Sequence, residues 1–380
     1  MRTSASPIWG EPISTSSSAK SDSCGTPTGR AAKVMRRFSG MRLASQVVRL
    51  GFYMGYAPPG TNPLELIALA QEAERLGYDS AWAAEAWGTD AVTVLSWLAA
   101  TTSTIRIGSA IMQIPGRTPA NTAMTAATLD LLSGGRFLLG LGTSGPQVVE
   151  GWHGQPWGKP ITKTREYVQI VRAALRREAL EFHGDQYDIP YSGDDATGLG
   201  KPLKLLVRPL RESIPIYLAA LSPKNVRTAF EIADGWLPIY FSPERARDAF
   251  GYEPREGFDI APAVNVIVSD DLEAARDMMR PLLALYIGGM GARGANFYNA
   301  LFRRYGYEAE AERIQELYLD GKQREAIAAV PDALIDDVSL VGPPERIRER
   351  LEAWRESGAT TLLVATRDVT SLRTMAELAL

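Results

Sequence analysis

The chain has 380 residues but only one cysteine and two histidines, and this scarcity excludes several kinds of site. An intramolecular disulfide needs two cysteines, and zinc sites are built from several cysteine and histidine ligands. We therefore expect no disulfide and no metal centre, and the lone Cys24 is compatible with the reducing cytoplasm. The G-x-S-x-G turn that carries the nucleophile of many hydrolases is also missing.

The sequence also lacks an excess of either charge and any long hydrophobic run. Its 41 Lys and Arg residues nearly balance its 44 Asp and Glu residues, for a formal net charge of −3. Nothing in this balance attracts nucleic acid or an anionic membrane surface. A membrane-spanning helix needs about 18 or more consecutive apolar residues, and the sequence contains no such run. We expect a small-molecule substrate, and neither nucleic acid nor membrane as partner.

Residues 1–45 differ in composition from the rest of the chain. They are rich in Ser, Thr, Pro and Gly and lack the apolar periodicity that would let a helix or strand bury one face. We therefore expect a disordered N-terminal tail, followed by one folded domain over residues 46–380.

Within residues 46–380, strand-like and helix-like segments alternate. The first four strand-like runs are VVRLGFYM, DSAWAAE, IRIGSAIM and GRFLLGLG, and a helical pattern follows each of them. Units of this length force parallel strands joined by right-handed crossovers. Counting to the final run, TTLLVAT, gives about eight strands, which favours an α/β fold of the (β/α)8 TIM barrel type. A doubly wound open sheet is the alternative.

The hexapeptide GLGTSG, residues 140–145, matches the dinucleotide signature G-x-G-x-x-G, but its context does not fit. A Rossmann site needs a helix directly after the glycines and an acidic residue about 20 positions later, at the end of the next strand. The next residues, PQVVEGWHGQPWGKP, are too rich in Pro and Gly for a long helix, and Glu166 falls inside a helical pattern. We therefore interpret GLGTSG as the C-terminal end of the fourth barrel strand, followed by a functional loop.

Three longer stretches carry a resemblance to a known family. They are AEAWGTDAVTVLSWLAATTSTIRIGSAI, the block LDLLSGGRFLLGLGTSG followed by EGWHG, and PIYLAALSPKNVRTAFEIADGW. Together they resemble the bacterial luciferase-like superfamily, and within it the oxidoreductases that use coenzyme F420, a deazaflavin. The resemblance is close over residues 47–240 and looser over the last sixty residues. It implies a TIM barrel, and with it a cytoplasmic, homodimeric enzyme.

The resemblance also implies a reaction. A hydride would pass between the reduced deazaflavin and an organic substrate, and the expected direction is reduction of a C=C, C=N or C=O bond. One alternative is a two-component monooxygenase that uses reduced FMN and oxygen. Another is a non-catalytic barrel that binds a flavin-like ligand.

The cofactor is expected in the mouth formed by the C-terminal ends of the strands. The resemblance implies a cis peptide between Ala110 and Ile111 behind its central ring, and its phosphate near strands four and five. The helix after Ser222 offers free N–H groups for an anion, although Ser222 as a simple helix N-cap is equally compatible. The expected cofactor contacts are Ala110, Ile111, Gln113, Gly142, Thr143, Ser144, Gln147, Ala220, Leu221 and Ser222.

Three residues are candidates for a catalytic role: Glu85, Trp87 and His153. Alcohol-oxidising relatives carry a motif similar to SDH where this chain has Glu85 and Ala86, so the histidine base is missing and reduction is favoured. Glu85 would donate a proton or hold a polar ring edge, or else form a structural salt bridge. Trp87 would stack on a ring or pack in the core, and His153 would act as acid or base or stabilise its loop.

Residues 272–335 read as a helical insertion that is expected to cover the mouth. Its aromatic residues Tyr286, Phe297 and Tyr298 are expected to shape substrate specificity, with ordinary helix packing as the alternative.

Overall fold

The computed structural model describes residues 48–57 and 60–380. The predicted tail over residues 1–45, including Cys24, lies outside this part of the chain. In the described residues no helix is both long and apolar enough to cross a membrane.

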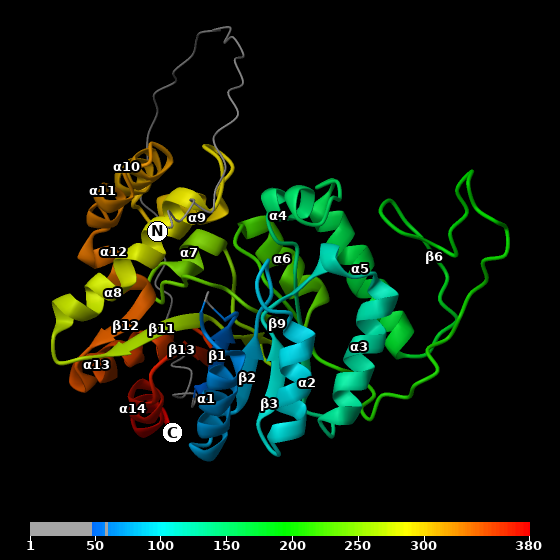
Figure 1. Cartoon of the computed structure of the whole chain (residues 1–380), viewed down its shortest axis with the longest axis horizontal. Helices are drawn as coiled ribbons and strands as arrows, with labels where there is room; N and C mark the ends of the chain where they lie inside the picture. Colours follow the sequence, from blue (N-terminus) through cyan, green and yellow to red (C-terminus); the bar gives the residue numbers. More distant parts are fainter. Residues whose placement is uncertain (1–47, 58–59) are drawn as a thin grey trace, which may run out of the picture. The chain divides into compact units, whose positions relative to one another are not determined.

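Eight parallel strand positions form a closed barrel, as the alternation predicts (Figure 1). In barrel order they are β1 (Arg49–Gly55), β2 (Ser80–Ala83), β3 with β4 (Arg106–Ser109, Met112–Gln113), β5 (Phe137–Gly142), β8 (Ile216–Leu218), β9 (Gly235–Trp236), β10 with β11 (Asp259–Ile260, Ala263–Val268), and β13 (Thr361–Ala365).

The barrel closes through the strand run that Ala261 and Pro262 interrupt. Before the interruption, β10 pairs with β9; after it, β11 pairs with β13, which in turn pairs with β1. The Ala263 N–H also donates to the Pro238 carbonyl, 3.0 Å away, beyond the end of β9. The open-sheet alternative is therefore wrong. An additional parallel strand, β12 (Ser339–Gly342), pairs with the second half of β11 and was not predicted.

Helices surround the barrel, and their ends follow local sequence signals. The helices are α1 (Pro63–Arg75), α2 (Ala91–Thr101), α3 (Pro119–Leu132), α5 (Pro160–Leu175), α6 (Pro223–Ile232), α7 (Ala246–Phe250), α13 (Pro344–Glu356) and α14 (Val369–Ala379). Asn62 and Thr118 accept hydrogen bonds from N–H groups in the first turns of α1 and α3, which satisfies donors that a helix leaves unpaired.

One inference about GLGTSG needs correction. A short helix, α4 (Pro146–Gly151), begins directly after Gly145, so the expectation that no helix follows the glycines at once is wrong. Proline at the first helical position is compatible with a helix start, which explains why a Pro-rich segment forms this turn. The interpretation as a barrel strand is nevertheless confirmed, because β5 lies between β3 and β8.

The segment predicted as an insertion is mainly helical, and its last helix ends at Val338. It consists of α8 (Leu272–Ala284), a π-helical turn (Leu285–Gly289), α9 (Phe297–Arg304), α10 (Glu308–Leu319), α11 (Gln323–Ala328) and α12 (Asp332–Val338).

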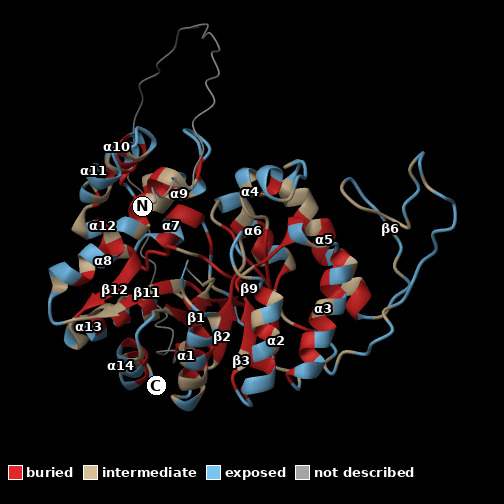
Figure 2. Cartoon of the chain, viewed as in Figure 1, coloured by how far each residue is buried: buried red, intermediate tan, exposed pale blue. Residues whose placement is uncertain are grey.

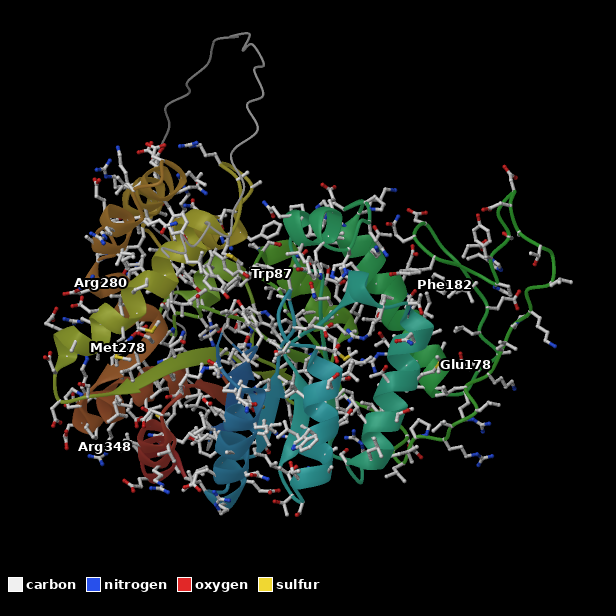
Figure 3. The ribbon with its side chains drawn as sticks, in the orientation of Figure 1. Trp87, Glu178, Phe182, Met278, Arg280 and Arg348 are labelled. Atoms are coloured by element: carbon white, nitrogen blue, oxygen red, sulfur yellow. The ribbon has the colours of Figure 1, made fainter. Side chains whose placement is uncertain are left out.

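A separate arm leaves the barrel after α5 and carries the hairpin of β6 (Phe182–His183) and β7 (Asp188–Ile189), seen at the right of Figures 1 and 3. The Glu166 carboxylate on α5 anchors this hairpin, because it accepts three hydrogen bonds of 2.8–3.1 Å from N–H groups of the hairpin turn.

The core has two parts, because a barrel buries both faces of its sheet (Figure 2). The larger part lies between strands and helices. The smaller part fills the barrel interior with Trp82, Ala110, Leu138, Tyr217, Leu237, Ala261 and Leu363. Tyr53, Ile111 and Ala263 are partly buried and pack against this inner cluster, so the barrel is filled and is not a pore.

Candidate functional site

The end of the third strand is reshaped where the cofactor ring was expected. The peptide between Ala110 and Ile111 is cis, as the resemblance implied, and it separates β3 from β4. Downstream of it, β4 continues beside the end of β5. Ile111 thereby comes to lie beside Gly142, where a Cβ atom would lie 2.9 Å from Ile111 Cγ1.

Glycine lets β5 approach its neighbour unusually closely. A Cβ atom on Gly140 would lie 1.8 Å from the Ser109 carbonyl oxygen. The Ser109 hydroxyl uses this closeness: it donates to the Gly140 carbonyl at 2.8 Å and accepts from the Gly140 N–H at 2.9 Å. The glycines of GLGTSG therefore serve strand packing as well as access to the mouth.

A pocket opens at the C-terminal ends of β5 and β8, where the phosphate was expected. Gly142 at the end of β5 and Thr143 after it meet Pro160 and Thr164 near the start of α5, with Asn225 of α6 also in the lining. The side-chain amide of Asn225 has no hydrogen-bond partner within the described part of the chain. First turns of helices present unpaired N–H groups, so this pocket suits an anion.

A second, adjoining pocket adds a cation. It is lined by Thr143, Pro160, Trp157 and Lys163, together with apolar residues of the loops after β4 and β5. Burial lowers the pKa of Lys163. Neither pocket has an Asp or Glu side chain in its lining. In linings without a carboxylate, the Asn225 amide and the Lys163 ammonium group form a donor set that fits a phosphate. The Thr164 and Thr228 hydroxyls already donate to the carbonyls of Pro160 and Lys224.

Three hydrogen bonds fix the loop after β8. The Ala220 carbonyl accepts from Trp236 Nε1 at 3.0 Å, and the Leu221 carbonyl accepts from the guanidinium of Arg304 on α9. The Ser222 hydroxyl accepts from the Asn225 N–H at 3.3 Å. Ser222 is thus the N-cap of α6, one of its two interpretations. Ala220 and Leu221 do not line either pocket, and their role as cofactor contacts stays a prediction.

The insertion contacts the same loops, and its position over the mouth stays a prediction. Besides the bond from Arg304, the Phe297 ring on α9 stacks on the ring of Trp157, with centroids 6.3 Å apart and planes inclined by 29°. The loops after β5 and β8 are therefore both tied to α9.

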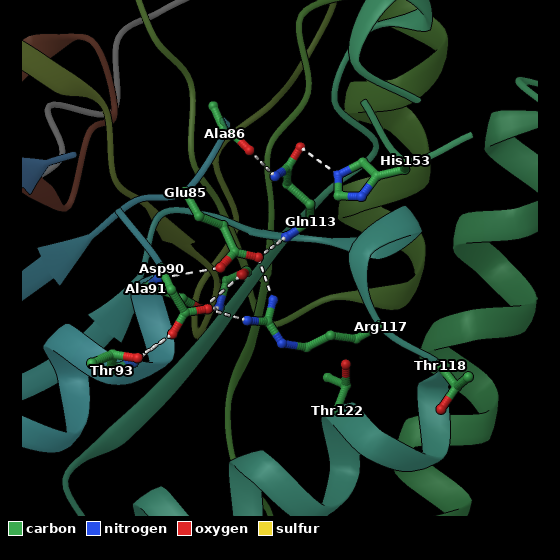
Figure 4. A network of polar contacts seen from close by, with 12 residues as sticks. Glu85, Ala86, Asp90, Ala91, Thr93, Gln113, Arg117, Thr118, Thr122 and His153 are labelled. Carbon is green, nitrogen blue, oxygen red and sulfur yellow. Dashed lines mark hydrogen bonds and ion pairs between the residues drawn. The ribbon is translucent and has the colours of Figure 1, made fainter. Parts of the chain in front are cut away.

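Glu85 takes part in a tight ion pair at the end of β2 (Figure 4). Its carboxylate accepts from Arg117, from the Gln113 N–H at 2.9 Å and from the Ala91 N–H at 3.2 Å. Burial works against the charge of Arg117, but the bonds and charges of Glu85 and Asp90 together outweigh it and raise the pKa of Arg117. This geometry favours the salt-bridge interpretation of Glu85.

Gln113 links this ion pair to His153. Its side-chain N–H donates to the Ala86 carbonyl at 2.6 Å, while its Oε1 lies 3.4 Å from His153 Nε2 (Figure 4). Gln113 is buried, and His153 is half-buried in the loop after α4. The structure thus brings Glu85, Gln113 and His153 into one network.

The remaining candidates lie at the rim. Trp87 is 38% exposed, so its interpretation as a core residue is wrong (Figure 3). Gln147 is exposed on α4, and Ser144 has a left-handed backbone with φ of 60°. Neither lines the two pockets, and their roles as cofactor contacts stay predictions.

Sequence reasoning missed Arg117, Lys163, Thr164 and Asn225. Asn225 lies three residues after Ser222, the N-cap of α6. Lys163 and Thr164 lie three and four residues after Pro160, the first residue of α5. The first turns of helices after strands four and five were thus the available signal. Nothing in the sequence pointed to Arg117 as the partner of Glu85.

The chain was compared with protein families. The model of the family described as luciferase-like monooxygenase matches residues 43–361. This chain belongs to the luciferase-like monooxygenase family. The match covers the barrel up to the start of β13, with the insertion, and so includes both pockets and the Glu85 network.

Relatives of this luciferase-like protein include F420 enzymes. A Mycobacterium tuberculosis protein, whose assignment as a coenzyme F420-dependent oxidoreductase is itself a prediction, is 43% identical over 87% of this chain and 99% of the relative. The 5,10-methylenetetrahydromethanopterin reductase of Archaeoglobus fulgidus is 28% identical over 80% and 90%. The F420-dependent tetrahydromethanopterin reductase structure from Methanopyrus kandleri superposes with a TM-score of 0.71 at 23% identity, over 87% of this chain and 98% of that one, a likeness of fold.

Proposed function

We propose that this luciferase-like protein is a cytoplasmic, coenzyme F420-dependent oxidoreductase that reduces a C=C, C=N or C=O bond of a small organic substrate. The observation that carries the proposal is the anion-binding donor set at the ends of β5 and β8, beside the reshaped end of β3. The 43% identity to a relative assigned to F420 chemistry supports it, since that relative matches over 99% of its own length.

The residues present fit such a cofactor. Gly142 leaves no side chain between Ile111 and the pocket, and Thr143, Asn225 and Lys163 would hold the phosphate of the cofactor tail. When bound, the deazaflavin supplies or accepts a hydride at its C5 carbon, which is the electron-carrying part of the reaction.

The protein's own part in the reaction is positioning and proton management. The ion pair of Glu85 and Arg117 fixes the Gln113 backbone, and Gln113 in turn bonds to the Ala86 carbonyl and to His153. His153 can carry a proton at the rim, where water still reaches it, and its ring is held by this network. Trp87 follows Ala86 directly in the chain, and its exposed ring is a candidate stacking surface.

A fluorescence titration with F420 and with FMN tests the proposal. We expect micromolar affinity for F420 and much weaker affinity for FMN, and stopped-flow mixing of reduced F420 with candidate acceptors should give oxidation of the cofactor. Preference for FMN would instead support the two-component monooxygenase. Tight F420 binding without turnover of any acceptor would support a non-catalytic ligand-binding barrel.

Lys163→Gln is expected to weaken F420 binding about tenfold, because it removes one charged contact to a phosphate. The affinity of the variant should also fall less steeply with salt concentration than that of the unchanged protein. Lys204→Gln, at an exposed position of the arm, is the charge-matched control. Equal affinities in both variants would remove Lys163 from the phosphate site.

We also propose that two copies of the chain associate through the outer faces of α2 and α3. Trp97 on α2 and Met124 and Leu132 on α3 are 55%, 55% and 61% exposed, and the two helices pack against each other. Large exposed apolar side chains on neighbouring helices are typical of a protein–protein interface. A two-fold dimer uses the same patch on both copies, so one surface is sufficient.

The double variant Trp97→Ser/Leu132→Ser is expected to shift the protein from dimer to monomer. Size-exclusion chromatography with light scattering at micromolar concentration would measure the mass. Leu64→Ser, a similarly exposed leucine on α1, is the control and should stay dimeric. A monomeric unchanged protein would contradict the dimer, and dimers in all variants would place the interface elsewhere.

A further inference from the structure

Five tyrosines from strand ends, loops and the insertion lie close enough to interact with one another. They come from distant parts of the sequence: Tyr53 from β1, Tyr56 from the loop after it, Tyr240 from the loop after β9, Tyr286 from the π-helical turn and Tyr298 from α9. We name Tyr53, Tyr56, Tyr240, Tyr286 and Tyr298 the tyrosine cluster.

Ring contacts hold three members of the tyrosine cluster together. The rings of Tyr286 and Tyr298 meet edge to face with centroids 4.7 Å apart, and Tyr240 contacts both, at 5.1 and 6.0 Å. Edge-to-face contact is a favourable arrangement for aromatic rings, so the trio is a preformed wall. Tyr53 packs on the inner core of the barrel and forms the adjoining floor.

The hydroxyl groups of this wall and floor have no hydrogen-bond partner among residues 48–57 and 60–380. Within the described residues, no hydrogen bond is recorded for the hydroxyls of Tyr53, Tyr240, Tyr286 and Tyr298, although the Tyr240 residue is only 2% exposed. Among the described residues, none of these oxygens belongs to the polar side-chain atoms that are both inaccessible to solvent and without a hydrogen-bond partner. Because buried polar groups are normally hydrogen-bonded, four hydroxyls without a bond among the described residues indicate a place for a polar ligand atom.

The backbone holds Tyr240 in an unusual conformation. Its φ is 53°, in the left-handed region, which is costly for a residue with a bulky side chain. The Tyr305 hydroxyl stabilises this conformation by donating to the Tyr240 carbonyl at 3.1 Å, and it accepts from the Ser242 N–H at 3.3 Å. A strained residue fixed by a second buried tyrosine is a feature of a binding site more than of a packing surface.

The electrostatic surroundings make these hydroxyls donors. Burial and the neighbouring tyrosines raise the pKa of Tyr53, Tyr240 and Tyr286, so all three remain protonated in the ordinary pH range. The charged group that acts on Tyr53 is Arg367, and its guanidinium donates to the Tyr56 carbonyl at 3.2 Å. Neutral O–H donors near a cation favour an oxygen that carries negative charge.

We infer that the tyrosine cluster is the substrate site, and that the hydroxyls of Tyr240 and Tyr298 donate hydrogen bonds to the carbonyl oxygen of a flat, cyclic or aromatic carbonyl compound. The reaction part of this inference rests on the proposed function, whereas the binding of the carbonyl compound does not depend on it. Reduction adds two electrons to the substrate as a hydride at carbon, and the C=O or conjugated π electrons move to the oxygen. The cofactor is oxidised by the same two electrons, and the oxygen or the adjacent carbon then takes one proton from solvent.

A phenolate probe tests the site without turnover. The phenolate of 4-nitrophenol is flat, carries a charged oxygen like that of the reacting substrate, and absorbs visible light. We expect the unchanged protein to bind the phenolate more tightly than the phenol and so to lower the apparent pKa of the bound probe. Tyr240→Phe and Tyr298→Phe should each bind the phenolate about tenfold more weakly, because each removes one hydrogen bond to a charged oxygen.

The unfolding temperature of each variant distinguishes a tyrosine hydroxyl that binds ligand from one that stabilises the fold. Tyr78→Phe is the matched control, since the buried Tyr78 hydroxyl donates to the Leu372 carbonyl at 2.9 Å. Tyr78→Phe should lower the unfolding temperature and leave phenolate binding unchanged. Tyr240→Phe and Tyr298→Phe, which lose hydroxyls without partners, should not lower the unfolding temperature.

The titration is run with and without F420, so that two failures are distinguishable. Absence of phenolate binding at millimolar concentration, or equal affinity in the unchanged protein and both phenylalanine variants, would overturn the tyrosine site. Phenolate binding that depends on Tyr240 and Tyr298 in a protein that does not bind F420 would overturn the proposed function and leave the tyrosine site standing.

Discussion

Arg117→Met is expected to lower the free energy of unfolding by about 3 kcal/mol, because it leaves a largely buried carboxylate without its cation. The side chains of Glu85 and Arg117 are only 8% and 17% exposed. After the substitution, Glu85 would keep the N–H bonds from Gln113 and Ala91 but no positive charge. Urea denaturation at constant m-value measures the difference as a shift of the midpoint.

A matched double variant distinguishes the loss of the ion pair from other destabilising effects of the substitution. Glu85→Gln/Arg117→Met removes both charges, so it should recover most of the stability that Arg117→Met loses. A double variant as unstable as Arg117→Met would show that the unpaired charge of Glu85 is not responsible, and would leave the lost ion pair with Asp90 or the methionine side chain as the cause.

The same pair decides what Glu85 does in the reaction. As a positioning residue, Glu85 acts through the Gln113 backbone and His153, and Glu85→Gln should lower kcat while the pH dependence of the rate keeps its shape. As a proton donor, Glu85 would contribute a limb to that profile, and Glu85→Gln would remove the limb. The three donors already bonded to its carboxylate lead us to expect the first result.

Gly140→Ala is expected to cost about 3 kcal/mol of stability, near the upper end for overpacking of a core. The new Cβ would lie 1.8 Å from the Ser109 carbonyl oxygen and 2.8 Å from Leu237 Cδ1. The side chain of Leu237 can move, but the Ser109 carbonyl belongs to the backbone where β3 ends. Separating β3 from β5 would also break the two hydrogen bonds of the Ser109 hydroxyl.

The control is Gly151→Ala on α4, where a Cβ atom would meet nothing within 4 Å and the backbone is not left-handed. That variant should be as stable as the unchanged protein or slightly more stable, since alanine favours the helix. Thermal or urea unfolding of the pair compares one methyl group in two surroundings. Equal stabilities would mean that the barrel adjusts its strand spacing more easily than its geometry indicates.

Local signals predicted most of the fold. Apolar runs of strand length became the barrel strands, and Asn62, Thr118 and Ser222 begin the helices that follow them, because a cap acts within one turn. The failures were also local. SLVG is too short to be told from a loop and is a strand only because β11 lies beside it, and Pro146 begins a helix in a segment that looked helix-breaking.

The candidate site was predicted unevenly. The strand ends in the mouth follow from topology, so Gly142 and Thr143 could be placed at a pocket before any coordinates. The resemblance placed the cis peptide at Ala110 and Ile111. Long side chains were harder, since Arg117 reaches Glu85 over 32 positions of sequence and any of many cations was a possible partner.

The sequence by itself determined the alternation of strands and helices, the family, and the strand ends that form the mouth, because periodicity, caps and family motifs are properties of contiguous residues. Only the tertiary structure decided which distant side chains meet there. The pair of Glu85 and Arg117 and the tyrosine cluster, which spans Tyr53 to Tyr298, depend on barrel closure and on the path of the insertion. Contacts of this kind are set by how elements pack in space, and no local pattern records that packing.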